Sequence, residues 1–240
     1  MKILITGKNA KNIEPLVRKL GLPAGRQGFE IVSAKPDVII SYGGDGTLLA
    51  SERKYPGVPK LPIRDSLICK KCPDHKEEVL LQSLLNAKLQ IKEYQKLETT
   101  IFYKTLTALN DFVIRNTQPI HTIRFKITPQ DKLLIGDGVV ISTPFGSSGY
   151  FKSITGETFQ KGFGLAFNNT TEQVPPVFFK DDDIVTFKLI RGTATLSFDN
   201  NPDIFKVDEG SELIFKLSNQ TAKIYAADSL RCPNCKITRG

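Results

Sequence analysis

A carboxylate set between glycines is the feature of this chain with the clearest chemical meaning. The stretch Gly43-Gly44-Asp45-Gly46-Thr47 follows the apolar run Val38-Ile39-Ile40, and a helical pattern begins at Thr47. Glycines at a strand-to-helix turn let the backbone approach a ligand and expose N–H groups to phosphate. An aspartate held there can bind a metal ion or accept a proton from an attacking hydroxyl. The simpler alternative is a tight turn with Asp45 as helix N-cap; we take the stretch as a phosphate site.

A second block, from Asp137 to Tyr150, has the composition of a ligand-binding loop. The buried strand Val139-Val140-Ile141 runs into a segment dense in hydroxyls and glycines, which Tyr150 closes. This composition suits sugar hydroxyls, phosphate oxygens and a stacked base. A plain Ser/Gly loop after a strand is the alternative.

An amide stands beside a carboxylate at Asn110-Asp111, where a helix-like stretch enters a strand. The amide of such a pair could hydrogen-bond the edge of a base, and the carboxylate could hydrogen-bond the two hydroxyls of a ribose. Taken alone, it is better explained as a capping Asn-Asp turn.

The four cysteines form two pairs, Cys69 with Cys72 and Cys232 with Cys235. Two such pairs in an intracellular chain favour a four-thiolate zinc site over disulfides. Their separation is far from the usual zinc-ribbon spacing, so the site requires the C-terminus to fold back on the first domain. One redox pair or four ordinary thiols are the alternatives. His75 could be a spare metal ligand, but a solvated residue at a helix start is the preferred interpretation.

The first part of the chain alternates predicted strands and helices, which implies a parallel α/β sheet. Ligands bind at the carboxyl ends of such strands, where the Asp45 stretch lies. The Tyr55 to Pro62 segment is proline-rich and is predicted to be a loop. The expected strands are 3–5, 29–32 and 38–40, and the expected helices are 12–20, one starting at 47, and 75–89.

From residue 95 onward, apolar and polar residues alternate with period two, with turn signals between the segments. This pattern predicts an antiparallel, sandwich-like β domain. The clearest predicted strands are 122–128, 184–190, 193–198 and 213–217. We therefore expect an α/β domain over 1–94, joined by the C-terminal segment 226–240, and a β-rich domain over 95–225.

The composition limits the classes of function. The chain has 240 residues, 40% of them hydrophobic, and a net charge of +8. No apolar run approaches the length that spans a bilayer, and no signal peptide is recognisable, so a cytoplasmic protein is expected. Because the lysines are scattered without interleaved aromatics, an anionic small substrate explains the charge better than nucleic acid.

Taken together, the three stretches resemble the NAD kinase family. GGDGT followed by Leu-Leu, an Asn-acid pair after Ala-Leu, and a DG…STPxGSxxY block occur in family order and with family-like spacing. The resemblance implies an α/β domain, a β-rich domain and a C-terminal segment that packs back on the first. It also implies phosphoryl transfer from ATP to the adenosine-ribose 2′-hydroxyl of NAD, giving NADP.

The resemblance also implies roles for individual residues and partners. Asp45 would be the base, and Asp137 would approach the nicotinamide side. A divalent cation, normally Mg²⁺, would accompany ATP, and the chain would assemble as a dimer or tetramer. The other implied binding residues are Gly43, Gly44, Gly46 and Thr47 around phosphates, Asn110 and Asp111 at adenine and ribose, and Ser148, Gly149 and Tyr150 in the adenine pocket.

The chain departs from the family pattern in several places. Asp111 replaces the usual glutamate, Phe145 the usual small hydroxyl residue, and Ser148-Gly149 the usual Thr-Ala. The glycine-rich loop that commonly follows GGDGT is missing, and the first cysteine pair stands near that position. A zinc clip that replaces the lost packing is a consistent hypothesis.

Two other classes of function stay open. A diacylglycerol-type lipid kinase shares GGDGT but lacks the STPxGSxxY block, and a dinucleotide-binding module could keep the pocket without turnover. The sequence does not choose between ATP and polyphosphate as donor, or between NAD and NADH as acceptor.

Overall fold

The chain folds as two compact units in a computed structural model that describes residues 1–20, 28–65 and 72–232. Unit 1 comprises Met1–Tyr94 together with the chain from Ala222 onward, and unit 2 comprises Gln95–Thr221. Two strands, β5 (Ile91–Ile101) and β16 (Glu212–Tyr225), contribute residues to both units.

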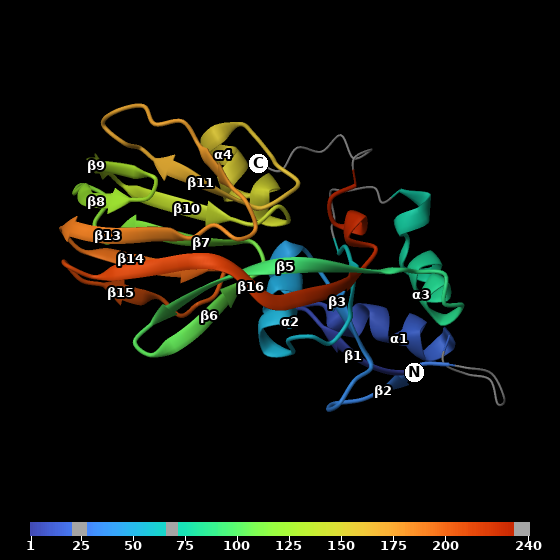
Figure 1. Cartoon of the computed structure of the whole chain (residues 1–240). Helices are drawn as coiled ribbons and strands as arrows, with labels where there is room; N and C mark the ends of the chain where they lie inside the picture. The colour runs from blue at the N-terminus through green and yellow to red at the C-terminus, as the bar shows by residue number, and fades with distance from the viewer. Residues whose placement is uncertain (21–27, 66–71, 233–240) are drawn as a thin grey trace. The chain divides into compact units, whose positions relative to one another are not determined.

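Unit 1 is built on a parallel sheet in the order β2-β1-β3-β4, with the end of β16 beside β4 (Figure 1). Every residue of β3 is buried, as expected for a central strand that reads as a continuous apolar run. The sheet confirms the predicted α/β class. The strands are β1 (Lys2–Thr6), β2 (Glu30–Ile31), β3 (Val38–Tyr42) and β4 (Lys60–Ile63).

The helices of unit 1 bury most of their apolar side chains, although Val79 in the predicted helix 75–89 is 39% exposed. Ile13 and Val17 of α1, Leu48 and Leu49 of α2, and Leu81 of α3 are at most 2% exposed. These helices are α1 (Ala10–Leu20), α2 (Asp45–Lys54) and α3 (Glu77–Leu85), with 3₁₀ turns η1 (Pro73–His75) and η3 (Ala227–Ser229).

The prediction of a loop from Tyr55 to Pro62 is wrong for its last residues. Lys60–Ile63 forms strand β4, and all four residues are buried. The Lys60 ammonium donates to the Glu52 carboxylate and to the Tyr55 carbonyl at 2.6 Å, so its charge is compensated inside the unit. Pro62 is tolerated because the described ladder between β4 and β16 reaches only Lys60.

Unit 2 confirms the antiparallel sandwich. One sheet has the order β12-β11-β10-β7-β14-β15, and the other contains β16-β13-β8-β9 and the β5–β6 hairpin. The strands are β6 (Lys104–Ala108), β7 (Asp111–Asn116), β8 (Ile123–Ile127), β9 (Gln130–Gly136), β10 (Gly138–Ser142), β11 (Phe163–Asn168), β12 (Val177–Phe179), β13 (Val185–Arg191), β14 (Ala194–Phe198) and β15 (Phe205–Val207). Short helical segments follow β10 at η2 (Gly146–Ser148) and α4 (Tyr150–Thr155).

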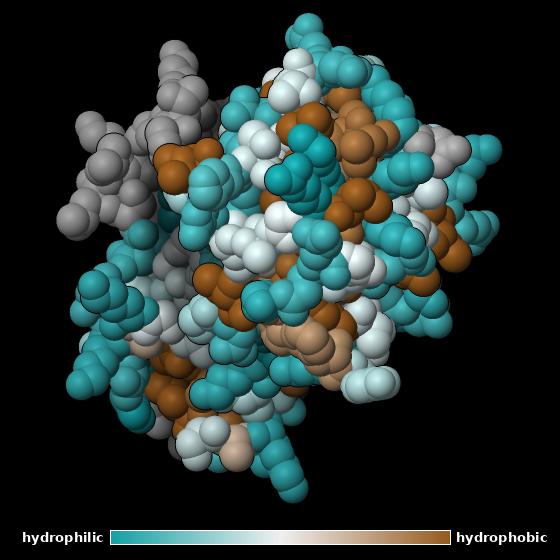
Figure 2. Space-filling view, turned by 90° about the vertical axis from the view of Figure 1, so that its left-hand side faces the viewer, coloured by the Kyte–Doolittle hydropathy of each residue, from teal (hydrophilic) through white to brown (hydrophobic). Residues whose placement is uncertain are grey.

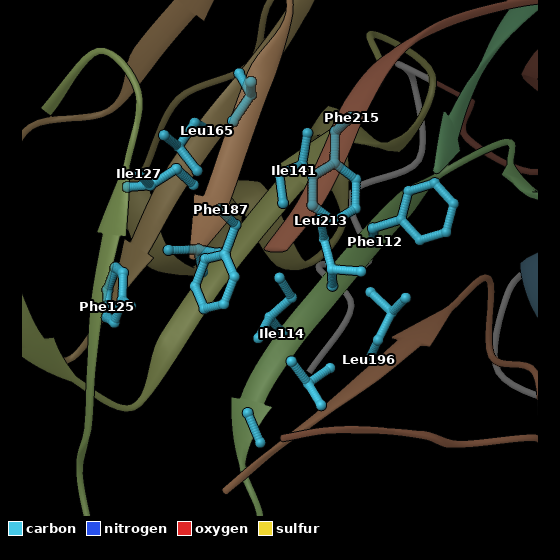
Figure 3. Packing of buried hydrophobic residues seen from close by; sticks show 14 of the residues in the cluster. Phe112, Ile114, Phe125, Ile127, Ile141, Leu165, Phe187, Leu196, Leu213 and Phe215 are labelled. Atoms are coloured by element: carbon cyan, nitrogen blue, oxygen red, sulfur yellow. The ribbon is translucent and has the colours of Figure 1, made fainter. Parts of the chain in front are cut away.

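The core of unit 2 lies between these sheets. Side chains of β7 and β10, such as Phe112 and Ile141, meet those of β13 and β16, such as Phe187 and Phe215 (Figure 3). Phe112 and Phe215 have ring centroids 5.4 Å apart. Each such burial stabilises the fold by roughly 1.5–3 kcal/mol. The stretch before Asn110 was predicted to be helix-like but forms strand β6. Its alternate residues Leu106 and Ala108 point into this core, as the period of a strand requires.

Hydrophilic residues cover most of the face drawn in Figure 2, and hydrophobic residues appear there in separate patches. Among the described residues, none of the helices is long and apolar enough to cross a membrane.

Candidate functional site

Asp45 is presented at the carboxyl end of a buried strand. β3 ends at Tyr42, Gly44 takes the N-cap position, and Asp45 is the first residue of α2. Asp45 is therefore not the N-cap. A side chain on Gly43 would put its Cβ 2.3 Å from Thr47 Oγ1, so this turn requires glycine. The Asp45 carboxylate is 20% exposed, and Arg231 Nε lies 3.8 Å from its Oδ1.

A pocket of about 470 Å³ adjoins this turn. Gly46 and Thr47 line it from the start of α2, and Gly7 and Lys8 line it from the end of β1. Lys54 adds a second ammonium group. Lys8 follows β1 and Lys54 is the last residue of α2, so two ammonium groups line a pocket that also contacts the first turn of the helix. Positive charge and helix N–H groups both favour an anion such as phosphate.

In unit 2, Asp199 holds the backbone of the Asn110-Asp111 turn. Its carboxylate accepts hydrogen bonds from Leu109 N at 2.6 Å and Asn110 N at 2.7 Å. Burial raises the pKa of Asp199 to about 6, although these backbone donors lower it. In the sequence, Asp199 is one of the turn signals that follow the predicted strand 193–198, and nothing in the local sequence points to a partner so far away.

The same turn is locked to the segment after β10. Thr143 N donates to Asn110 O at 2.9 Å, and Thr143 Oγ1 donates to Leu109 O at 2.6 Å. A Cβ on Gly146 would lie 2.1 Å from Asn110 O. The structure thus brings the Asn110 pair and the hydroxyl-rich loop together. Asn110 Oδ1 is buried and has no hydrogen-bond partner in the part of the chain described.

Asp137 lies at the other end of β10, away from Thr143 along the strand. Asn116 Nδ2 and Asn169 Nδ2 donate to its two carboxylate oxygens at 3.3 Å and 3.1 Å. Tyr150 Oη accepts from Asn168 Nδ2 at 3.3 Å. Asn168 pairs with Gly138, the first residue of β10. The Tyr150 hydroxyl therefore lies near the end of β10 that adjoins Asp137.

The exposed residues Ser148 and Gly149 precede Tyr150 at the end of η2. They lie a few residues after Thr143, which is hydrogen-bonded to the Asn110 turn.

A potential metal-ligand cluster lies in unit 1. Cys72, His75 and Cys232 place their ligand atoms within 4.8 Å of one another, and the two Sγ atoms are 3.3 Å apart. The other two cysteines of the predicted site, Cys69 and Cys235, fall outside the described residues. The expectation of a solvated His75 is wrong, because its side chain is 13% exposed and contacts Asp228.

Comparison with known sequences relates the chain to one group of enzymes. It is 30% identical over 177 residues to an NAD kinase of Sulfurisphaera tokodaii, with 70% of each chain covered. It is 31% identical over 164 residues to an NAD kinase of Saccharolobus islandicus. That match spans 67% of this chain and 65% of the relative's length. No family model matches the chain.

Solved structures share the fold at lower identity. An NAD kinase from Archaeoglobus fulgidus in complex with ATP matches with a TM-score of 0.74 and 19% identity, covering 96% of both chains. Yeast NADH kinase complexed with NADH matches with a TM-score of 0.71 and 17% identity, covering 95% of this chain and 74% of that one.

Proposed function

Since the chain belongs to the NAD kinase family, we propose that it transfers the terminal phosphoryl group of ATP to the adenosine-ribose 2′-hydroxyl of NAD, giving NADP. The observation that carries this proposal is Asp45, a partly exposed carboxylate at the start of α2 with glycines on both sides. Phosphoryl transfer depends mainly on positioning and on neutralising charge, and this turn supplies backbone N–H groups and a proton acceptor at one place.

In this mechanism Asp45 orients the 2′-hydroxyl and accepts its proton as the oxygen attacks the γ-phosphorus. The new O–P bond forms while the bond from the γ-phosphorus to ADP breaks, so ADP leaves with the electron pair. Gly43, Gly44, Gly46 and Thr47 surround phosphate groups through their backbone, and Lys8 and Lys54 supply positive charge in the adjoining pocket.

A divalent cation is expected with ATP. A carboxylate oxygen is a hard donor of the kind that Mg²⁺ prefers, and the partly exposed Asp45 offers one. When bound, the ion neutralises the charge that develops on the phosphates.

Unit 2 supplies the residues proposed to recognise the dinucleotide. The buried Asn110 Oδ1 lacks a partner among the described residues, which suits an amino group of adenine. Asp111 is proposed for the ribose hydroxyls, and Ser148, Gly149 and Tyr150 for the adenine pocket. Asp137, held by two asparagine amides, is proposed for the nicotinamide side.

Three further features are proposals. Structural zinc at the cysteine pairs is supported by the approach of Cys72 Sγ to Cys232 Sγ. A dimer or tetramer and a cytoplasmic location stay predictions from the resemblance and the composition.

The test is incubation of the protein with NAD, ATP and Mg²⁺, followed by enzymatic quantification of NADP. Parallel reactions with NADH and with polyphosphate identify the acceptor and the donor. NADP formation that depends on ATP is the expected result. Bound NAD without NADP would favour a binding module, and phosphorylation of diacylglycerol instead would favour a lipid kinase.

A further inference from the structure

We propose that Cys72, His75 and Cys232 bind a zinc ion that fixes the C-terminal segment so that Arg231 lies against Asp45. The functional part of this inference rests on the proposed kinase activity, whereas the metal site does not. The sequence pattern favoured a four-thiolate site and left His75 as a less favoured ligand, whereas the structure places His75 beside Cys72 and Cys232.

The donor set suits zinc. Two thiolates and an imidazole are ligands that Zn²⁺ commonly takes in proteins. All three ligand atoms lie within 4.8 Å of one another, and the thiols are 3.3 Å apart. Each of the three residues is only partly accessible. Cys72 and Cys232 are 160 residues apart in the sequence, so an ion that they share would tie the C-terminal segment to η1.

The histidine has the outer partner that a metal ligand needs. His75 Nε2 lies 3.2 Å from Asp228 Oδ2. A carboxylate at one ring nitrogen fixes the ring orientation and leaves the other nitrogen, Nδ1, as the metal donor. Asp228 belongs to η3, four residues before Cys232, so the C-terminal segment supplies both a ligand and an outer partner.

The segment that carries Cys232 is docked on β4. Ser229 Oγ donates to Pro62 O at 2.5 Å, and Arg64 Nη1 donates to Leu230 O at 2.8 Å. Leu230 is 2% exposed. Pro62 pairs with Ser41 of β3, so this docking lies two positions from the turn that carries Asp45. The segment is already held by hydrogen bonds at residues 229 and 230. A Zn²⁺ ion bound to Cys232 would fix it at a third point.

Arg231 stands between the docked Leu230 and the ligand Cys232. Its Nε lies 3.8 Å from Asp45 Oδ1, and both side chains are about one fifth exposed, at 21% and 20%. With its neighbours fixed on both sides, the guanidinium has little freedom to leave the carboxylate. Arg231 is thus a positioning residue that holds Asp45 in place, and the metal centre holds Arg231.

The first experiment measures metal without measuring activity. Protein purified without chelator is expected to contain about one zinc ion per chain, and cobalt exchange should give the absorption of tetrahedral thiolate-bound Co²⁺. Cys72→Ser should abolish retention of the ion. His75→Ala should weaken zinc affinity by more than about 10- to 100-fold in a chelator competition, because that loss is typical of removing only an outer partner of a ligand. His121→Ala, at the only other histidine, is the matched control and should retain wild-type affinity.

Two results would overturn the metal site. One is wild-type protein without zinc, especially with a peptide map that links Cys72 to Cys232 as a disulfide. The other is His75→Ala with unchanged zinc affinity, which would remove His75 from the ligand set.

The second experiment tests the link to Arg231. Trypsin cleavage after Arg231 should be at least about tenfold faster in His75→Ala or chelated protein, since proteolysis follows local opening. Cleavage after the exposed Arg191 should not change. Equal cleavage after Arg231 with and without metal would overturn the positioning role.

Turnover then separates this inference from the proposed function. Arg231→Ala should keep its zinc, lower kcat at least about tenfold and leave KM for NAD nearly unchanged, with partial rescue in Arg231→Lys. Unchanged kcat in Arg231→Ala would overturn the role. If wild-type protein makes no NADP, the kinase proposal fails, while zinc content and trypsin cleavage still decide the metal site and its hold on Arg231.

Discussion

At the scale of single residues, Asp45 is the most direct test of the proposed chemistry. We expect Asp45→Asn to lower the rate of NADP formation by about 10²- to 10⁴-fold, because the amide cannot accept the proton of the 2′-hydroxyl. Affinity for NAD, measured by calorimetry, should stay within about threefold. Asp181→Asn, at an exposed aspartate of unit 2, should leave both quantities unchanged. Full turnover in Asp45→Asn would refute the base assignment.

Asp199 predicts a pH dependence of stability. Its pKa is raised from 3.8 to about 6 in the folded state, chiefly by burial. The folded protein therefore binds this proton more tightly than the unfolded chain. The stabilisation is fully present below about pH 3.8 and is lost as pH rises through about 6.

The measurement compares wild type with Asp199→Asn by urea unfolding between pH 4 and pH 7.5. At pH 7.5 the variant should be less stable by about 1–3 kcal/mol, since one amide oxygen replaces two acceptors of backbone N–H groups. Toward pH 4 the difference should grow by up to about 3 kcal/mol, because only wild type gains the proton. A difference that is constant across this range would contradict the assigned pKa.

Candidate site residues could be selected from the sequence where the motif was local. The stretch around Asp45 and the block from Asp137 could be selected because their residue types and spacing lie within a few positions. Asp199 could not, because its partner Asn110 is 89 residues away. His75 was misjudged for the same reason, since Asp228 and Cys232 approach it only through the fold.

At the scale of elements, hydrophobic periodicity was sufficient for the strands of unit 2. Period-two segments such as 123–127 and 185–191 are strands of the sandwich. β4 was missed because proline and lysine argue against a buried strand. Here the charge of Lys60 is compensated by Glu52, a contact that propensity cannot reveal.

This buried pair gives a test of the element that supports the Asp45 turn. Lys60→Met removes the buried ammonium that pairs with the Glu52 carboxylate, which is 2% exposed. We expect a loss of about 3–5 kcal/mol in the free energy of unfolding, while Lys60→Met combined with Glu52→Leu should recover most of it. Chemical denaturation of the three proteins is the measurement. Equal stability of Lys60→Met and wild type would show that the pair is not coupled.

The Asn110 turn is packed against Gly146 in the loop after β10. A larger residue at position 146 is therefore expected to weaken NAD binding. In Gly146→Ala the new Cβ would lie 2.1 Å from Asn110 O, so one of the two segments must move. We expect NAD affinity to fall at least about tenfold because Asn110 is displaced. Lys152→Ala, at an exposed residue of α4, is the control for calorimetry. Wild-type affinity in Gly146→Ala would exclude Asn110 from dinucleotide recognition.

At the scale of the whole molecule, charge is the property that separates substrate classes. The chain carries 33 Lys and Arg against 25 Asp and Glu. The sequence could indicate an anionic ligand from this excess, but it could not show that Lys8 and Lys54 line one pocket. Those two residues are brought together by β1 and α2.

The net charge of +8 predicts that binding of ATP weakens with salt. Raising salt from about 0.1 M to about 1 M shortens the Debye length from about 10 Å to about 3 Å, so long-range attraction of a polyanion is lost. We expect KM for ATP to rise about fivefold or more over this range, with a smaller effect on KM for NAD, whose charge is lower. Lys54→Gln should reduce the salt dependence for ATP, whereas Lys206→Gln, at an exposed lysine of unit 2, should preserve it. A KM for ATP that is independent of salt in wild type would mean that this charge excess does not act on the phosphate donor.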